Sequence, residues 1–267
     1  MKFIRSCLKT IFTIIATLFF YGCFAIGYLI LKLFRQETGG IRNFCLTLWG
    51  KSVCKILSIE VEVVGNIPEP PFFLVSNHLS YVDIIIYFKT LKTTFVSKAE
   101  VKNWPVIGFM AKTLEIIFID RRRKSDVARV NQSVAGQISE YKGVVLFPEG
   151  TTSSGESLLP FKPSILEHPA KSLMPVHYAY ITYETGPKDI DAIYSVCWWN
   201  DEPFGSHFFK FAGNRTTKAR IRFGEKTIHK SERKELAAEL YKKVKVLHLQ
   251  NQQHSELKVS NEKSVKS

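Results

Sequence analysis

A stretch of 21 uncharged residues, 11–31, sets the first limit on what this chain can fold into. As a helix it would be about 30 Å long, which matches the hydrocarbon core of a bilayer. A cleaved signal peptide has a shorter apolar part, followed by a small-residue cleavage site and a polar mature chain. Here Lys32 and Arg35 follow directly instead, so the sequence predicts a retained membrane segment.

A second apolar-rich segment, residues 41–58, has an imperfect helical stripe of apolar side chains. A Gly-Gly turn at 39–40 separates it from the first segment. Basic residues flank the first segment on both sides, so charge sets no orientation across a membrane. The pattern favours a monotopic helical hairpin over residues 1–58 as a membrane anchor, and a single span followed by a juxtamembrane helix is the alternative.

The formal net charge of +13 indicates an anionic partner, which is either nucleic acid or a membrane surface. The apolar segment favours the membrane, so we expect no nucleic-acid partner. A hydrophobic fraction of 45% with 13% aromatic residues excludes disorder for most of the chain. The five Cys do not form a disulfide framework, and the seven His lack Cys or carboxylates at ligand spacing, so we expect no metal site.

After residue 58, short apolar strands alternate with helices. The strands are expected at 59–64, 72–75, 94–96, 115–119, 143–147, 173–180 and 219–223, and the helices at 82–91, 105–113, 124–141 and 231–249. This alternation predicts an α/β fold: a single domain over residues 59–250 with a mostly parallel sheet covered by helices. The polar residues 251–267 are expected to form a disordered tail.

A histidine directly follows one predicted strand, in the motif NHLSYVD, where His78 precedes Asp83 by five residues. The two side chains can meet only if His78 lies in a loop and Asp83 in the first helical turn. Asp83 would then fix the imidazole tautomer and leave the other ring nitrogen free as a base. The alternative is a capping box from Ser80 to Asp83 that serves only the helix start. Because there is no GxSxG motif and Cys197 lies beside two Trp, the base is expected to act on a substrate hydroxyl.

Two other predicted strands end in polar segments. Four cations, Arg121 to Lys124, follow one strand, where an Arg cluster suits a phosphate and a solvated charge run is the alternative. The segment FPEGTTSSG at 147–155 follows another strand and can offer backbone N–H groups and hydroxyls to an anion, although an ordinary loop is the alternative. Ligands of α/β sheets gather at the carboxyl ends of strands, so these segments are candidates for one site.

Together, NHLSYVD, FIDR and FPEGT resemble the glycerolipid acyltransferase family, which includes 1-acyl-sn-glycerol-3-phosphate acyltransferase. The resemblance covers residues 58–225, including FVSK at 95–98, PVIG at 105–108 and MPV at 174–176. It implies an acyltransferase of phospholipid biosynthesis in which His78, oriented by Asp83, deprotonates the acceptor hydroxyl. The hydroxyl would attack the thioester of an acyl-CoA or acyl carrier protein directly, without a cofactor.

The resemblance also implies six substrate-binding residues. The expected roles are the acceptor's anionic headgroup for Arg121, a second phosphate contact for Lys98, acceptor positioning for Glu149, Gly150 and Thr151, and acyl-donor binding for Pro175.

One position departs from the family pattern, because Thr152 stands where FPEGTRS has Arg. Lysophosphatidic acid is the simplest acceptor, and lyso-ornithine lipid, another lysophospholipid or glycerol 3-phosphate are alternatives. The segment around Trp198 and Trp199 resembles a feature of bacterial lysophospholipid acyltransferases, including relatives that acylate lyso-ornithine lipids; simple packing is its alternative. A non-catalytic, basic membrane-binding protein is the second alternative for the chain. The expected location is the cytoplasmic face of a bacterial inner membrane.

Overall fold

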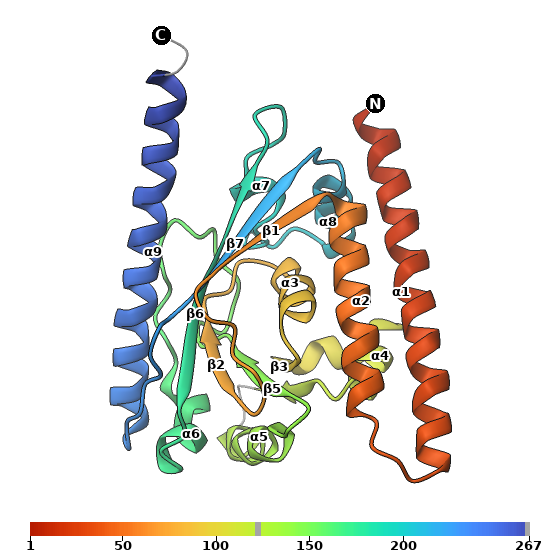
Figure 1. Ribbon diagram of the computed structural model, residues 1–267, viewed down its shortest axis with the longest axis vertical. Helices are drawn as coiled ribbons and strands as arrows, with labels where there is room; N and C mark the ends of the chain where they lie inside the picture. The colour runs from red at the N-terminus through yellow and green to blue at the C-terminus, as the bar shows by residue number, and fades with distance from the viewer. Residues whose placement is uncertain (121–123, 265–267) are drawn as a thin grey trace.

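The computed structural model describes the backbone of residues 1–120 and 124–264, and the side chains of 1–120, 126 and 129–253. Two long helices come first, α1 (Lys2–Leu33) and α2 (Gly39–Leu57), and they pack side by side as a hairpin (Figure 1). Among the described residues, α1 is the one helix long and apolar enough to cross a membrane.

Helix α1 lies along the rest of the molecule instead of standing apart from it. Near its start, the Arg5 guanidinium donates to the Gly213 carbonyl from two nitrogens, at 2.9 and 2.6 Å. Farther along, the hydroxyl of Tyr21 lies 2.9 Å from Oγ1 of Thr113. The domain therefore holds α1 at several points, and the choice between a monotopic hairpin and a single span stays a prediction.

A single mixed sheet follows the hairpin, and in the described residues it runs in the order β1-β7-β6-β2-β5-β3-β4. Its strands are β1 (Ile59–Val64), β2 (Phe73–Ser76), β3 (Thr93–Lys98), β4 (Ile117–Ile119), β5 (Gly143–Leu146), β6 (Val176–Thr185) and β7 (Thr217–Phe223). Strands β6, β2, β5, β3 and β4 are parallel, while β7 pairs antiparallel with β6 and parallel with β1. The mostly parallel α/β fold is therefore confirmed.

Helices cover both faces of this sheet (Figure 1). With α1 and α2 on one side lie α3 (Val82–Thr90), α4 (Ile107–Thr113), α7 (Ala192–Ser195) and α8 (Phe204–Ala212); on the other lie α5 (Lys124–Gln137), α6 (Glu167–Lys171) and α9 (Arg233–Ser264). Short 3₁₀ turns, η1 (Ala99–Asn103) and η2 (Pro163–Leu166), precede α4 and α6. Every residue of β2 and β5 is buried, as expected of apolar strands covered on both faces.

The C-terminal helix differs from the prediction. Helix α9 continues to Ser264, well past residue 249, so the described part of the expected disordered tail, 251–264, is helical. The chain has no Gly or Pro after Gly224, and Gln, Glu, Lys and Leu favour the helix even without an apolar stripe. At the start of this part, Oδ1 of Asn251 accepts a hydrogen bond from Arg220 at 3.4 Å. The division of the chain at residues 58 and 250 stays a prediction.

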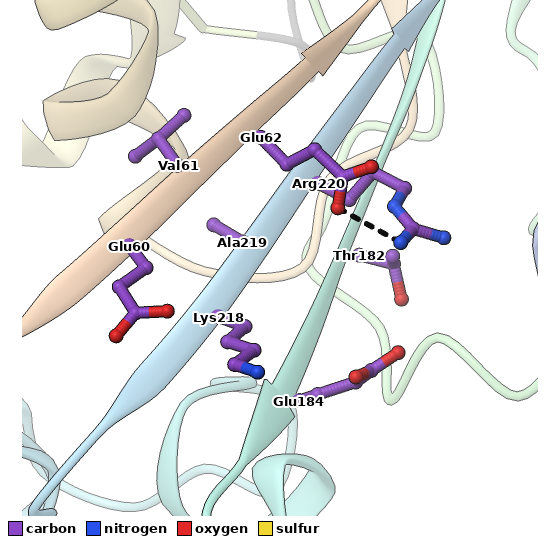
Figure 2. A pocket seen from close by; sticks show the side chains of 8 residues that line it. All are labelled: Glu60, Val61, Glu62, Thr182, Glu184, Lys218, Ala219 and Arg220. Carbon is purple, nitrogen blue, oxygen red and sulfur yellow. Dashed lines mark hydrogen bonds and ion pairs between the residues drawn. The ribbon is translucent and has the colours of Figure 1, made fainter. Parts of the chain in front are cut away.

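Charged side chains alternate across β1, β7 and β6 around a shallow groove of about 340 Å³ (Figure 2). Glu60 faces Lys218, and Lys218 faces Glu184 on its other side. One step farther, Arg220 donates to Glu62 at 2.8 Å. Opposite charges directly across a strand pair stabilise that pairing, so these pairs help to hold the edge strand β1 in register.

Candidate active site

The carboxyl end of β2 carries the predicted histidine. Strand β2 ends at Ser76 and α3 begins at Val82, so His78 lies in the connecting loop and Asp83 in the first helical turn. This is the arrangement that the five-residue spacing requires. Nδ1 of His78 lies 2.7 Å from Oδ2 of Asp83, and the Asp83 side chain is fully buried.

Four donors converge on the Asp83 carboxylate. Besides His78, the backbone N–H groups of Leu79 and Ser80 donate to Oδ2 at 2.8 and 3.1 Å. The hydroxyl of Tyr183, from β6, donates to Oδ1 at 2.5 Å. Burial, followed by the charge of Asp83, raises the pKa of Tyr183 well above its usual value, so the hydroxyl keeps its proton. Asp83 therefore acts only as an acceptor, which assigns the proton of His78 to Nδ1 and leaves Nε2 free.

The two interpretations of Asp83 turn out to be compatible. The bond from the Ser80 N–H to the Asp83 carboxylate is the return half of a capping box, and Oγ of Ser80 accepts from the Val82 N–H at 3.3 Å. The same carboxylate thus closes the start of α3 and orients His78. The imidazole of His78 is therefore bonded directly to the residue that closes the start of α3.

The other side of the His78 ring packs on Phe147, the last residue before the Pro-Glu-Gly turn. The ring centroids are 4.0 Å apart and the planes differ by 11°. His78 keeps 20% of its side chain exposed. The ring is therefore held by a stacking partner and a carboxylate while one edge stays accessible.

The FPEG loop also contacts the backbone of His78. Oε1 of Glu149 accepts from the His78 N–H at 3.3 Å, and the Ser153 N–H donates to the His78 carbonyl at 3.0 Å. Gly150 has φ +80°, a conformation that strains any residue with a Cβ. Burial, and secondarily the charge of Asp83, raises the pKa of Glu149 to about 8, so at neutral pH this side chain is mostly a neutral carboxylic acid.

Thr152, the residue that departs from the family pattern, is turned toward the Trp198 segment. Its hydroxyl donates to the Trp198 carbonyl, and the Trp198 N–H donates to the Leu79 carbonyl at 2.8 Å. This segment therefore joins the His78 loop to the FPEG loop. The threonine hydroxyl is occupied by a protein carbonyl.

A buried histidine supports the same segment. His207 is fully buried in α8, with Nε2 3.0 Å from the Cys197 carbonyl and Nδ1 3.0 Å from the Tyr81 hydroxyl. A carbonyl only accepts, so Nε2 donates and Nδ1 accepts from Tyr81. Burial lowers the pKa of His207, which agrees with a neutral ring. Phe147 belongs to the FPEG segment, which was already predicted for the site from the sequence. Tyr183 could not be assigned to the site from the sequence, because its contact with Asp83 depends on the pairing of β6 with β2.

A cavity of about 810 Å³ lies between the helical hairpin and the domain and reaches His78. This volume is within the range of small-molecule sites. Its wall is mostly apolar and comes from α1, α2, α3, α4, α8 and the end of β3; the lining residues include Phe20, Trp49, Phe88, Met110, Trp198 and Phe208. An elongated apolar group, such as a fatty acyl chain, suits such a wall.

The structure brings most of the predicted site residues together around His78, but not all of them. His78, Gly150 and Thr151 line the cavity, Asp83 and Glu149 contact His78, and the exposed Lys98 lines the cavity from the end of β3. Pro175 lies just before β6, at the end of the parallel strands opposite to His78, so the structure does not bring it to the others. Arg121 lies outside the described residues. Within the described ranges, no group of three or more His, Cys, Asp or Glu residues is placed to hold a metal ion.

The acyltransferase family model matches residues 58–181. A lyso-ornithine lipid O-acyltransferase of Pseudomonas aeruginosa is 36% identical over 135 residues, which are 51% of this chain and 52% of that protein. A 1-acyl-sn-glycerol-3-phosphate acyltransferase of Neisseria gonorrhoeae is 32% identical over 167 residues, which are 59% of this chain and 66% of that protein. The chain thus matches between about half and two thirds of the length of these two relatives.

The fold is also similar to a solved structure. The crystal structure of the 1-acyl-sn-glycerophosphate (LPA) acyltransferase PlsC from Thermotoga maritima superimposes with a TM-score of 0.63 at 21% identity, over 92% of this chain and 98% of that one. The family suggested by the sequence motifs is confirmed. Residues 58–181, which contain the His78 loop, its Asp83 partner and the FPEG turn, form an acyltransferase-family domain.

Proposed function

We propose that this protein is a membrane-bound O-acyltransferase that moves a fatty acyl group from an acyl thioester to the free hydroxyl of a lysophospholipid. Acyl-CoA or an acyl carrier protein would supply the thioester. The simplest acceptor is 1-acyl-sn-glycerol-3-phosphate, which would give phosphatidic acid. The observation that carries the proposal is the His78–Asp83 pair at the wall of a large apolar cavity.

The chemistry follows from the tautomer of His78. Its free Nε2 accepts the proton of the acceptor hydroxyl while the hydroxyl oxygen attacks the thioester carbonyl carbon. The new C–O ester bond forms, the C–S bond breaks, and the imidazolium returns the proton to the leaving thiolate. A protein nucleophile is unnecessary, and burial raises the pKa of the Cys197 thiol, which disfavours a thiolate there.

The cavity and the loops around it suggest how the substrates would lie. The acyl chain would occupy the apolar cavity, with its thioester near His78. Gly150, Thr151 and Lys98 line the cavity, which supports their proposed contacts with the acceptor. Glu149, as a neutral acid, would position the acceptor from the FPEG loop, which contacts the backbone of His78. The proposed headgroup role of Arg121 has no structural support within the described residues, and Pro175 lies too far from His78 to support a role there.

Membrane attachment is part of the proposal, because a lysolipid with an acyl chain resides in the bilayer. Helix α1 supports it: side chains such as Phe12, Ile15, Phe19 and Leu29 are more than half exposed. The net charge of +13 suits anionic headgroups and supports a location on the cytoplasmic face of a bacterial inner membrane.

A second acceptor is favoured by one observation. The Thr152 hydroxyl is bonded to the Trp198 carbonyl, at the position where the family pattern has a cation. Losing that cation weakens recognition of a phosphomonoester. Lyso-ornithine lipid, the substrate in the name of the Pseudomonas aeruginosa relative, has no phosphate and is the second candidate.

An acceptor panel tests the proposal. The purified full chain in mixed micelles would receive a labelled acyl-CoA or acyl carrier protein together with lysophosphatidic acid, glycerol 3-phosphate, a zwitterionic lysophospholipid or lyso-ornithine lipid. Ester formed mainly from lysophosphatidic acid supports the first candidate, and ester formed mainly from lyso-ornithine lipid supports the second. Absence of ester from every combination of donor and acceptor would contradict acyl transfer.

A further inference from the structure

Residues 104–109, which we call the α4 turn, connect η1 to α4 and include the first three residues of α4; they carry exposed apolar side chains. Val106 is 62% exposed, Ile107 is 41% exposed and Phe109 is 63% exposed. Three large apolar side chains this close together on a surface mark an interaction site more often than a water-facing loop.

The backbone of the same turn is strained. Val106 has φ +61° and ψ −58°, and the Ile107 N–H donates to the Pro105 carbonyl at 2.6 Å, which makes a γ-turn of the rare positive-φ type. A β-branched residue is a genuine outlier there. Gly108 packs so tightly against η1 that an added Cβ would lie 2.3 Å from the Lys102 carbonyl oxygen, so η1 supports the turn on that side. A water-facing turn with this backbone would use Gly or Asn, so the presence of Val at a strained position indicates that its side chain has a use.

This turn is continuous with the exposed face of α1. The Tyr21 ring of α1 meets Phe109 with the centroids 6.4 Å apart, and its hydroxyl lies 2.9 Å from Oγ1 of Thr113 at the end of α4. Next to Tyr21 along α1, Leu18 and Phe19 are also more than half exposed. The turn and the helix therefore form one apolar surface, which we call the α1–α4 surface.

The charges around the turn favour a lipid partner. Among the described residues near the turn, Lys98, Lys102 and Lys112 are exposed, against the carboxylates Glu100 and Glu115, and Glu115 is paired with Lys142. An apolar centre with a cationic rim complements a bilayer that contains anionic headgroups. Val106 and Ile107 also line the cavity, so part of their exposed surface faces it and the turn borders the proposed site of the acyl chain.

We propose that residues 104–109 insert into the upper acyl region of an anionic bilayer, as a second membrane contact beside α1. The inference deepens the proposed function, and rests on it only in that the acceptor is a bilayer lipid. It gives the cavity a wall that lies in the membrane, between α1 and α4, so that a lipid chain could pass between bilayer and cavity without crossing water.

Depth-dependent quenching tests this proposal directly. Phe109→Trp places an indole at the tip of the turn, and Leu249→Trp is the matched control on α9, which lies on the opposite side of the sheet from α1 (Figure 1). Leu249 is 48% exposed, and neither position lines the cavity. The full chain would be bound to phosphatidylglycerol vesicles with and without bromine on the upper acyl carbons, and the parent signal subtracted. The indole at 109 is expected to lose roughly half or more of its added fluorescence, because interfacial side chains reach that depth.

Equal, weak quenching at the two positions would overturn the proposal. Acyl transfer by both variants in mixed micelles, measured beside the quenching, separates the two hypotheses. Quenching at 109 without any transfer would contradict the proposed function and leave the membrane contact standing, whereas transfer without quenching would contradict the contact alone.

A second variant addresses the strain. Val106→Gly removes the side chain that strains the backbone, and with it the proposed apolar contact with the bilayer. Because the strain is relieved, the Tm in micelles should rise. Partition into phosphatidylglycerol vesicles should fall on the order of tenfold, the value of one buried aliphatic side chain. A higher Tm with unchanged partition would also overturn the proposal.

Discussion

The carboxylate of Asp83 accepts a hydrogen bond from Nδ1 of His78 at 2.7 Å. It also accepts hydrogen bonds from the backbone N–H groups of Leu79 and Ser80, just before α3. One side chain therefore orients the base and also closes the start of the helix. Orienting His78 and closing the start of α3 both require a group that only accepts hydrogen bonds. Changes that turn this carboxylate into a donor should affect both catalysis and stability.

Replacing the carboxylate by an amide tests this coupling. Asp83→Asn keeps the size of the side chain but places an NH₂ group among four donors, so His78 loses its tautomer. We expect kcat to fall by about 10²–10⁴-fold and unfolding to become easier by about 1–3 kcal/mol. Acyl-transfer kinetics and thermal unfolding check the two effects. A large loss of kcat at unchanged stability would contradict the double role.

Tyr183 supports Asp83 from the far side. Tyr183→Phe removes the donor to Oδ1 and leaves a buried acceptor with one fewer partner. We expect a loss of about 1–3 kcal/mol in the free energy of unfolding and a smaller loss of kcat than in Asp83→Asn, with the acceptor KM unchanged. Tyr194→Phe, at a residue that is 57% exposed, is the matched control. Equal effects of the two substitutions would show that the Tyr183 hydroxyl does not support Asp83.

Glu149 predicts a pH dependence of stability. Its pKa is about 8 in the folded protein, against 4.5 for the unperturbed group, so the folded state holds a proton that the unfolded chain has released between these values. Stability from this group is therefore complete below about pH 4.5 and declines as the pH rises toward about 8. Tm measured across this range should fall less steeply for Glu149→Gln, which stays neutral, than for the parent. Parallel curves would mean that Glu149 is ionised throughout the range.

The headgroup preference depends on position 152. Thr152→Arg restores the cation of the family pattern, and Thr152→Val removes the bond to the Trp198 carbonyl without adding charge. We expect the arginine variant alone to raise kcat/KM for lysophosphatidic acid relative to lyso-ornithine lipid, by roughly tenfold, the value of one charge-assisted hydrogen bond. The ratio comes from competition between the two acceptors. A similar shift in both variants would assign the preference to the lost bond and not to charge.

Local patterns predicted the parts of the site that are close together in the sequence. The strand before His78, the helix that starts near Asp83 and the loop after Phe147 follow from apolar runs and turn residues within a few positions. The contact between Tyr183 and Asp83 joins residues 100 positions apart, and it depends on the pairing of β2 with β6, which no local pattern specifies. Such contacts are set by tertiary packing.

Two other differences concern helices. Helix α8, which carries His207, lies where no helix was predicted, although helices of similar length, α3 and α4, were predicted. The prediction that residues 251–267 form a disordered tail rested on their lack of aromatic and scarcity of apolar side chains. Residues 251–264 contain neither Gly nor Pro, and half of them are Gln, Glu, Lys or Leu, which favour a helix even without an apolar stripe.

The central claim is that Nε2 of His78 takes the proton of the acceptor hydroxyl. The most direct measurement is the rate of acyl transfer by His78→Ala in mixed micelles, with His229→Ala, at an exposed histidine outside the cavity, as the matched control. The account predicts that kcat falls by about 10²–10⁴-fold in the first variant and stays unchanged in the second, while both still bind phosphatidylglycerol vesicles. Full activity in His78→Ala would contradict the account.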